Sequence, residues 1–452
     1  MNSMRALLFG AFACGLLTGF SGPPEPGGES ADPGRVWTMR EAVRVALEDN
    51  PDVAMVARRV EEAAAHLARA RSAYAPRIAV GGGYHATDRP GQAFGMILNQ
   101  GAFAPGMDFN RPGTVDNLNV HARVEYTLYD GNARGAARDA ARESGVAAEA
   151  MEEAVRNDIA LAVVRVFLRG RQAGARIDAA RAHLEALAKA VEYAEQRSQA
   201  GAMIEAEVLH LRVEEARARE ELLRAENALE LVKRAFVRLL GMSHQPLEFD
   251  ADSWAEAIPP VSPEAASGGV VRPELESAAR ERAAAAAEVR RSRAGLRPHV
   301  SLFGRVDHDR GWETDGSGES WSAGITVDYT LWDRGAVRSE AAAARSRLGA
   351  AEARERRVRL AIEQEIAEAR LEHEEAAARV QVTREWLELA RENVRLARAR
   401  FEEGAYLAYQ YSEAESRLVA ARFAHESARI DRVAAAAAVR RAEGHFPLEN
   451  LP

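Results

Sequence analysis

The chain contains one long segment twice, and this repetition constrains its architecture more than any single motif does. Tyr129-Asp130-Gly131 returns as Trp332-Asp333-Arg334, and Gly201 returns as Gly404. Corresponding residues lie 203 positions apart, and 71 positions separate the aspartate from the glycine in each copy. The segment was therefore duplicated without a net insertion, which predicts two copies of one structural unit.

Each copy contains two runs in which apolar and polar residues alternate. The clearest run is Leu118 to Asp130, and Trp321 to Asp333 is its counterpart. Two further runs begin after Pro76 and Pro298. A period of two is typical of a sheet that meets water on one face only. We expect four strands in two hairpins, at about residues 77–85, 118–129, 299–308 and 320–332.

An apolar sheet face needs a partner, and the rest of the chain contains almost no other strand-like sequence. An ordinary half-buried sheet of a soluble protein is the alternative interpretation. The two clearest runs are long enough to cross a bilayer, because roughly 9 to 11 tilted residues suffice. Open sheet edges are too costly in hydrocarbon, and four strands are too few to close a barrel around a passage. Several chains are therefore expected to share one barrel.

The amino terminus indicates export. One arginine, an apolar stretch from Ala6 to Phe20 and small residues near its end predict a signal peptide over residues 1–21. Cys14 is the only cysteine and lies in this segment, so the mature chain is expected to form no disulfide. Lipidation of Cys14 is the alternative, but the leucine usual three places earlier is absent. Residues 22–36 are expected to form a linker rich in proline and glycine.

The remaining sequence is helical in character, being rich in Ala, Arg, Glu and Leu. Heptad spacing at Val380, Leu387, Val394 and Phe401 indicates coiled-coil packing. A helix of about 70 residues would reach roughly 105 Å, which suits a conduit better than a compact domain. We expect a first repeat at 37–241, a link at 242–272, a second repeat at 273–444 and a tail at 445–452. Within the repeats, we expect long helices at about 131–200 and 334–403, followed by return helices at about 203–241 and 406–443.

Other candidate sites are weak. Asp307-His308-Asp309 could bind a metal ion but is interpreted as part of a solvated loop. Gly81-Gly82-Gly83 lacks the context of a phosphate-binding loop and indicates a flexible or closely packed strand. Residues 85–117 are expected to form a long extracellular loop that could fold over the barrel mouth. The formal net charge of −8 does not suggest nucleic-acid binding.

The order, duplication and spacing of these motifs resemble those of the TolC-like outer-membrane efflux proteins, over essentially the whole mature chain. Asn50-Pro51 is similar to the break after the family's first helix, and Pro76 and Pro298 match the prolines that lead into its hairpins. The stretches Arg197 to Leu209 and Arg400 to Glu415 resemble the repeated elements around its periplasmic turns.

This resemblance implies a mostly α fold with a small membrane β part. Three chains would form a twelve-stranded β-barrel in the outer membrane, continued by a long α-helical periplasmic tunnel. The resemblance implies no enzyme activity, no cofactor and no nucleic-acid partner, but contact with outer-membrane lipid. The homotrimer would be the exit duct of a tripartite efflux pump or a type I secretion system. Substrates would pass from an inner-membrane pump or secretion ATPase, contacted through a periplasmic adaptor protein.

The resemblance also suggests which residues form the periplasmic end. In the family, acidic residues six and nine positions after the tip glycine constrict the entrance, and the matching positions here are Glu207, Gln410 and Glu413. Rings of three carboxylates would attract cations. The alternative for each glutamate is an i,i+4 ion pair on a solvated helix. Adaptor docking is expected at the two tips, formed by Gly201, Ala202, Met203, Gly404, Ala405 and Tyr406.

The chain also departs from the family pattern. Phe401 and Tyr406 stand where some members have a tyrosine and an arginine, so the family's closing hydrogen bonds and ion pairs are not expected here. Two functions from other classes fit the sequence less well. A periplasmic coiled-coil scaffold or adaptor component would not explain the apolar strand faces, and a secreted hydrolase would need a nucleophile, base and acid at a useful spacing.

Overall fold

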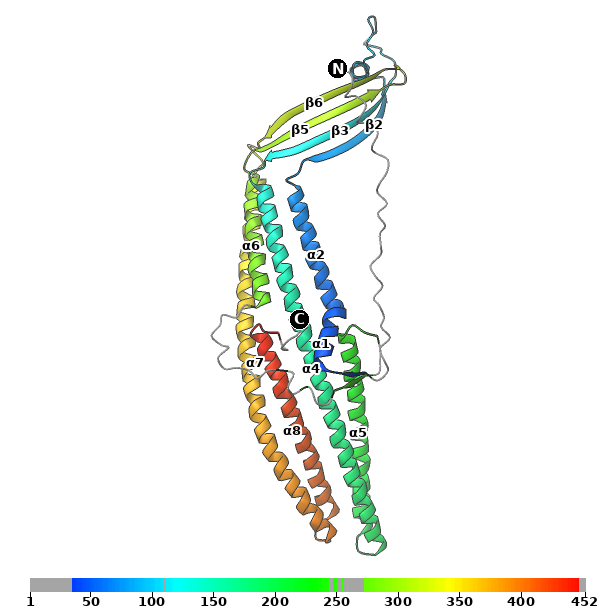
Figure 1. The fold of residues 1–452 in the computed structure, drawn as a ribbon, viewed down its shortest axis with the longest axis vertical. Coiled ribbons are helices and arrows are strands. Elements are labelled where there is room, and N and C mark those ends of the chain that lie inside the picture. The colour runs from blue at the N-terminus through cyan, green and yellow to red at the C-terminus, as the bar shows by residue number, and fades with distance from the viewer. Residues whose placement is uncertain are drawn as a thin grey trace.

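The protein is an elongated molecule with a β-sheet at one end and long helices that extend away from it (Figure 1). The computed structural model describes residues 35–108, 110–243, 247–250, 254, 258 and 272–446. The predicted signal peptide over 1–21, Cys14, nearly all of the predicted linker and most of the predicted link and tail lie outside these residues. Within the described ranges, no helix combines the length and the apolar character needed to cross a membrane.

The helices repeat in length as well as in order. Each copy contains one long helix of 67 residues. A helix of 22 residues packs beside the half of this long helix that is nearer the sheet, and a helix of 35 residues returns along the other half (Figure 1). These helices are α2 (Pro51–Ser72), α4 (Ala133–Gln199) and α5 (Glu205–Leu239) in the first copy, and α6 (Pro273–Ala294), α7 (Ala336–Glu402) and α8 (Ala408–Ala442) in the second.

Small and aliphatic side chains form the seams between these helices. On α7, Leu387, Val394 and Phe401 are buried at the predicted heptad spacing. On α4, Leu187 and Val191 are buried in the same way. Outside these seams many arginines pair with glutamates three or four positions away on the same helix. The long helices therefore depend on a narrow seam of contacts rather than on a broad core.

Each long helix begins three residues after the repeated aspartate, at Ala133 and at Ala336. Asp130 accepts hydrogen bonds from the backbone amides of Asn132 (3.1 Å) and Arg134 (2.8 Å). Asp333 accepts equivalent bonds from Gly335 (2.8 Å) and Val337 (2.9 Å). These carboxylates satisfy amide groups that have no partner within the helix. The repeated motif thus fixes the junction between sheet and helix.

A compact hydrophobic core lies near the middle of the molecule, and it contains two short strands in the region of the expected linker and link. It includes β1 (Arg35–Trp37), which pairs in parallel with β4 (Leu247–Phe249), and α1 (Met39–Asp49). The buried rings of Trp37 and Phe236 lie edge to face at 6.2 Å. Three-residue strands give almost no periodic signal, so packing between distant segments determines this element.

The side chain of Asn50 stabilises the break between α1 and α2. Its Oδ1 accepts a hydrogen bond from the amide of Asp52 at 2.7 Å, and its Nδ2 donates to the carbonyl of Leu239 at 2.7 Å. The side chain therefore caps α2 and also joins it to the end of α5.

The sheet has four antiparallel strands in the order β2-β3-β5-β6 (Figure 1). The two hairpins meet where β3 pairs with β5, so each outer strand, β2 and β6, has one edge without a paired strand among the described residues. The strands are β2 (Arg77–Thr87), β3 (Val115–Tyr129), β5 (His299–Arg310) and β6 (Ser317–Asp328).

The end of the last strand and the assignment of one polar segment differ from the sequence-based expectation. The last strand was expected to continue to residue 332 but ends at Asp328, because its partner β5 begins at His299 and pairs that residue with Asp328. The interpretation of Asp307-His308-Asp309 as a solvated loop is wrong, since these residues belong to β5. Asp309 is buried and accepts a hydrogen bond from Asn117 Nδ2 at 2.6 Å. The backbone register pairs it with Asn119 of β3 and with Gly318 of β6.

The first long loop contains a helix that the sequence analysis did not predict. Helix α3 (Pro90–Asn99) begins with a proline, and its Ala93 and Ile97 pack against Val115. The buried side chain of Gln100 follows and donates to the carbonyl of Asp116 at 2.6 Å. The segment is therefore packed against the end of the sheet.

Candidate functional site

Two turns at the end of the molecule farthest from the sheet join α4 to α5 and α7 to α8 (Figure 1). Gly201 and Gly404 have φ angles of 73° and 77°, a region that glycine adopts without steric cost. After each glycine, an alanine amide bonds back to an arginine carbonyl at 2.8 Å, in Ala202 to Arg197 and in Ala405 to Arg400. Both tips therefore have the same hydrogen-bonded helix ending.

An aromatic cluster connects the two tips. The ring of Phe401, from α7, stacks on Tyr411, from α8, with centroids 5.2 Å apart. The ring of Tyr193, from α4, also contacts Phe401, and the centroids of these two rings are 5.5 Å apart. These rings belong to a core that also contains Leu187 and Leu211 of the first copy. Phe401, the position that departs from the family pattern, therefore holds the two helical hairpins together by packing.

Hydrogen bonds reinforce this connection. Tyr193 Oη donates to the backbone carbonyl of Glu402 at 2.6 Å, and Arg197 Nη1 donates to the same carbonyl at 3.0 Å. At the second tip, Arg400 Nη1 donates to Tyr406 Oη at 3.0 Å. The tips thus have a hydrogen-bonded link made from residues that the sequence analysis did not single out for this role.

The three residues expected at the entrance have different surroundings. Glu413 forms an ion pair of 2.6 Å with Arg417, four positions along the same helix, which is the alternative considered for it. Gln410 Oε1 accepts a hydrogen bond from the Leu407 amide at 2.9 Å and so caps α8. Glu207 lies in the first turn of α5, and among the described residues no cation is within ion-pair distance of its carboxylate. Of the three residues, Glu207 therefore best matches a free acidic group at the entrance.

The apolar residues at the tips divide into two groups. Met203 and Tyr406 are half-buried and pack against the tip core. Ile204 and Leu407 follow them and expose 66% and 50% of their surface. Both exposed residues lie three positions after a tip glycine, so the duplication places one on each hairpin. Their exposure depends on helix packing and could not be read from composition alone.

A buried histidine lies behind the tips. His183, on α4, is 8% exposed, and its Nε2 has no hydrogen-bond partner among the described residues. Burial lowers the pKa of His183 below its usual value, and nearby carboxylates including Glu415 oppose this shift. The neutral imidazole is therefore the form that suits the folded protein.

At the other end of the molecule, the two faces of the sheet differ sharply. Large apolar side chains are exposed on one face, and the cross-strand register places them side by side. They include Ile78, Val80, Val124, Val306, Trp321 and Ile325. The opposite face carries polar and charged residues. An exposed apolar surface of this extent marks a contact with a partner or with lipid.

The glycine run of β2 has a packing role on the polar face. A Cβ atom added to Gly81 would lie 2.8 Å from the His121 ring, and the two residues are cross-strand partners. The run therefore makes room for a histidine, in agreement with the closely packed strand that was one of the two alternatives.

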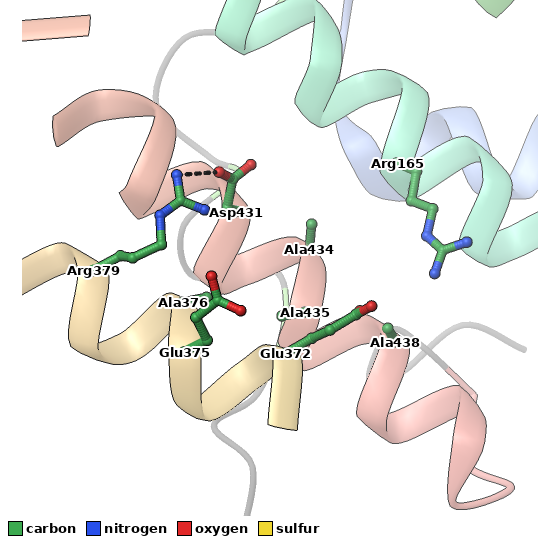
Figure 2. Close-up of a pocket in the computed structure, with 9 residues that line it drawn as sticks. All are labelled: Arg165, Glu372, Glu375, Ala376, Arg379, Asp431, Ala434, Ala435 and Ala438. Carbon is green, nitrogen blue, oxygen red and sulfur yellow. Dashed lines mark ion pairs between the residues drawn. The ribbon is translucent and has the colours of Figure 1, made fainter. Parts of the chain in front are cut away.

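A small hollow of 240 Å³ lies where α7 and α8 face α4, as Figure 2 shows. Its floor is formed by alanines of α8, and Arg165 of α4 faces Glu372 of α7 across it. The one ion pair drawn joins Arg379 to Asp431 at 3.4 Å. Within the described ranges, no group of three or more His, Cys, Asp or Glu side chains could hold a metal ion.

A family model described as "Outer membrane efflux protein" matches residues 42–242 and 270–445. None of the curated protein sequences compared matches the chain. Among solved structures, CusC, described in connection with transmembrane channel formation, is 17% identical with a TM-score of 0.78, covering 90% of this chain and 92% of its own. The outer membrane protein VceC of Vibrio cholerae is 20% identical with a TM-score of 0.76, covering 90% and 96%.

The outer membrane channel MtrE of Neisseria gonorrhoeae, in its open state, is 16% identical with a TM-score of 0.70, covering 91% of this chain and 90% of its own. At these identities the structural likeness shows the fold, while the family model covers most of the sequence. The resemblance inferred from the repeated motifs is confirmed, and the chain belongs to the outer membrane efflux protein family.

Proposed function

We propose that three copies of this outer-membrane efflux channel combine their sheets into one twelve-stranded β-barrel and their helices into one periplasmic tunnel. The observation that carries this proposal is the sheet, which exposes an apolar face and, within the described part of the chain, leaves one edge of each outer strand unpaired. An open edge is too costly in hydrocarbon, whereas pairing β6 of one copy with β2 of the next would leave none. The apolar face would then contact lipid.

The duct would be passive. An inner-membrane pump or a secretion ATPase would drive transport. A periplasmic adaptor would dock at the tips, where Ile204 and Leu407 supply exposed apolar contacts beside Gly201 and Gly404. Three copies of Glu207 and Glu413 would surround the entrance. Glu207 would be the carboxylate available to cations, because it forms no ion pair with any described residue.

A photocrosslinking amino acid at Ile204 or Leu407 tests the docking end in living cells. The expected result is capture of a periplasmic adaptor from both positions. The control is Leu231, on α5 away from the tip, which is 68% exposed and so matches Ile204 in exposure. Equal capture from Leu231 and the tips would contradict the docking proposal.

The membrane part is tested separately by fractionation. The protein should be found in the outer membrane and should migrate as a heat-modifiable oligomer on gels. A periplasmic scaffold would instead be released with the soluble periplasmic proteins and would show no heat-modifiable species. That result would contradict the proposed barrel.

A further inference from the structure

The polar face of the sheet carries an excess of arginine where it approaches the helices. A hollow of 1420 Å³ lies between this face and the sheet-proximal ends of the helices, and six arginines line it against three carboxylates. Two of these arginines serve the fold. Arg134 pairs with Asp130 at 3.1 Å, and Arg297 donates to the carbonyl of Gly131 at 3.1 Å.

The arginines on the strands are arranged in an unusual way. Arg123 of β3 and Arg305 of β5 are directly opposite each other in the register, on the same polar face. Like charges in this relationship destabilise a sheet. Each one pairs with a carboxylate two residues along its own strand, Arg123 with Glu125 at 3.3 Å and Arg305 with Asp307 at 2.7 Å. The carboxylates reduce the repulsion, but they do not explain why two arginines occupy facing positions.

A third arginine lies beside this pair. Arg77 is the cross-strand partner of Glu125 on the outer strand β2. It is exposed, and within the described part of the chain no carboxylate is close enough to form an ion pair with it. The side chains of Arg123 and Arg305 also remain partly accessible, at 45% and 36%. All three guanidinium groups can therefore meet a solute in the hollow.

Violation of a local stability rule at an accessible polar surface points to function. Guanidinium groups match the planar, two-oxygen geometry of carboxylates and phosphates, and a concave wall concentrates their field. We propose that Arg77, Arg123 and Arg305 form an anion-binding belt on the inner wall of the duct, which contacts acidic groups of organic anions during export.

This proposal rests on the proposed trimeric duct, in which the belt would occur three times around the passage. It would give the sheet end a preference for anions, opposite in sign to the preference expected from Glu207 at the tips. Substrates with a carboxylate or phosphate group would be held briefly at this level, because partial exposure and salt weaken each contact.

Reconstitution in planar bilayers tests the belt, with a tenfold KCl gradient and citrate as the anionic probe. In the wild type, citrate should reduce the current, and replacement of Arg77, Arg123 and Arg305 by glutamine should lower the chloride-to-potassium permeability ratio by about threefold. Arg310→Gln is the matched control, because Arg310 lies on β5 with the opposite side-chain parity. The control should leave both properties unchanged.

The single variant Arg77→Gln guards against misfolding, because it leaves no carboxylate without its ion-pair partner. It should shift the ratio in the same direction, and Arg77→Lys should restore it. Pores with unaltered selectivity and citrate response in both glutamine variants would overturn the belt while leaving the duct in place. Absence of any pore in the wild type would refute the duct itself and the belt with it.

Discussion

Arg197 on the first helical hairpin donates a hydrogen bond of 3.0 Å to the backbone carbonyl of Glu402 on the second. Tyr193 donates to the same oxygen at 2.6 Å and receives a hydrogen bond from Arg197 at 2.9 Å. Because the acceptor is a backbone group, the link does not depend on the side chain at position 402. These contacts join the two tips within one chain.

Replacing Arg197 by alanine should loosen the two hairpins at the tips. A hydrogen bond to a charged group contributes about 1.5–3 kcal/mol, and partial exposure places this one at the lower end. Spin labels at Leu209 and Leu396, on the two hairpins, should report a broader distance distribution. Arg181→Ala is the control, since its 3.1 Å ion pair with Glu226 lies within the first hairpin. An equally narrow distribution in both variants would contradict a linking role for Arg197.

Arginine substitutions at two adjacent residues of β6 should have unequal effects. Ile325 lies on the apolar face and is 63% exposed, whereas Thr326 lies on the polar face. In a membrane sheet, arginine on the lipid face near the bilayer centre costs about 2–4 kcal/mol. We expect Ile325→Arg to reduce the heat-modifiable species in outer membranes and Thr326→Arg to retain it. The opposite order would mean that the faces are assigned the wrong way round.

Two glycines of α4 should respond to alanine with opposite signs. A Cβ on Gly170 would lie 2.4 Å from the ring of Phe249, whereas a Cβ on Gly174 would meet nothing within 4 Å. Gly170→Ala should therefore lower the free energy of unfolding by about 1–3 kcal/mol through overpacking. Gly174→Ala should raise it by about 0.5–1 kcal/mol through helix propensity. Thermal unfolding of the purified protein measures both, and a stabilising Gly170→Ala would refute the packing assigned to Phe249.

Mild acid should weaken the region behind the tips through His183. Burial depresses the pKa of this imidazole in the folded protein below its usual value of 6.5, so the unfolded chain takes up the proton first as the pH falls. The resulting stability is present above pH 6.5 and decreases below it, until the folded-state pKa is passed. His183→Leu should reduce the loss of Tm between about pH 7.5 and 5.5.

His66→Gln is the control for this experiment, because the His66 side chain on α2 is 62% exposed. It should leave the pH dependence of Tm as in the wild type. An unchanged slope in His183→Leu would show that other groups set the acid response.

Periodic and repeated features were accessible from the sequence. The alternation around Leu118 and Trp321 indicated which strand face is apolar, and the duplication related the tip at Gly201 to the one at Gly404. Contacts that join segments distant in the sequence could not be predicted from it. Arg272 and Arg441 both bind Glu365, at 2.6 and 2.7 Å, although neither lies near it in the sequence.

The short elements escaped prediction for a related physical reason. Strands β1 and β4 have three residues each, which is too few to show a period, and their position depends on a buried Trp37. The helix over Pro90–Asn99 is stabilised by contacts with Val115, while its composition is typical of a loop. At the tips, only packing distinguishes the half-buried Met203 from the exposed Ile204.

Three copies should close one barrel by pairing β6 of each copy with β2 of the next. Cysteines introduced together at Ala79 on β2 and at Ser322, Gly324 or Thr326 on β6 would test it in oxidised outer membranes, since all lie on the polar face. At the correct register we predict a covalent trimer and nothing larger, while Ala79→Cys alone should yield monomers. Monomers at every register, or a series of covalent oligomers larger than a trimer, would contradict closure of the barrel by three copies.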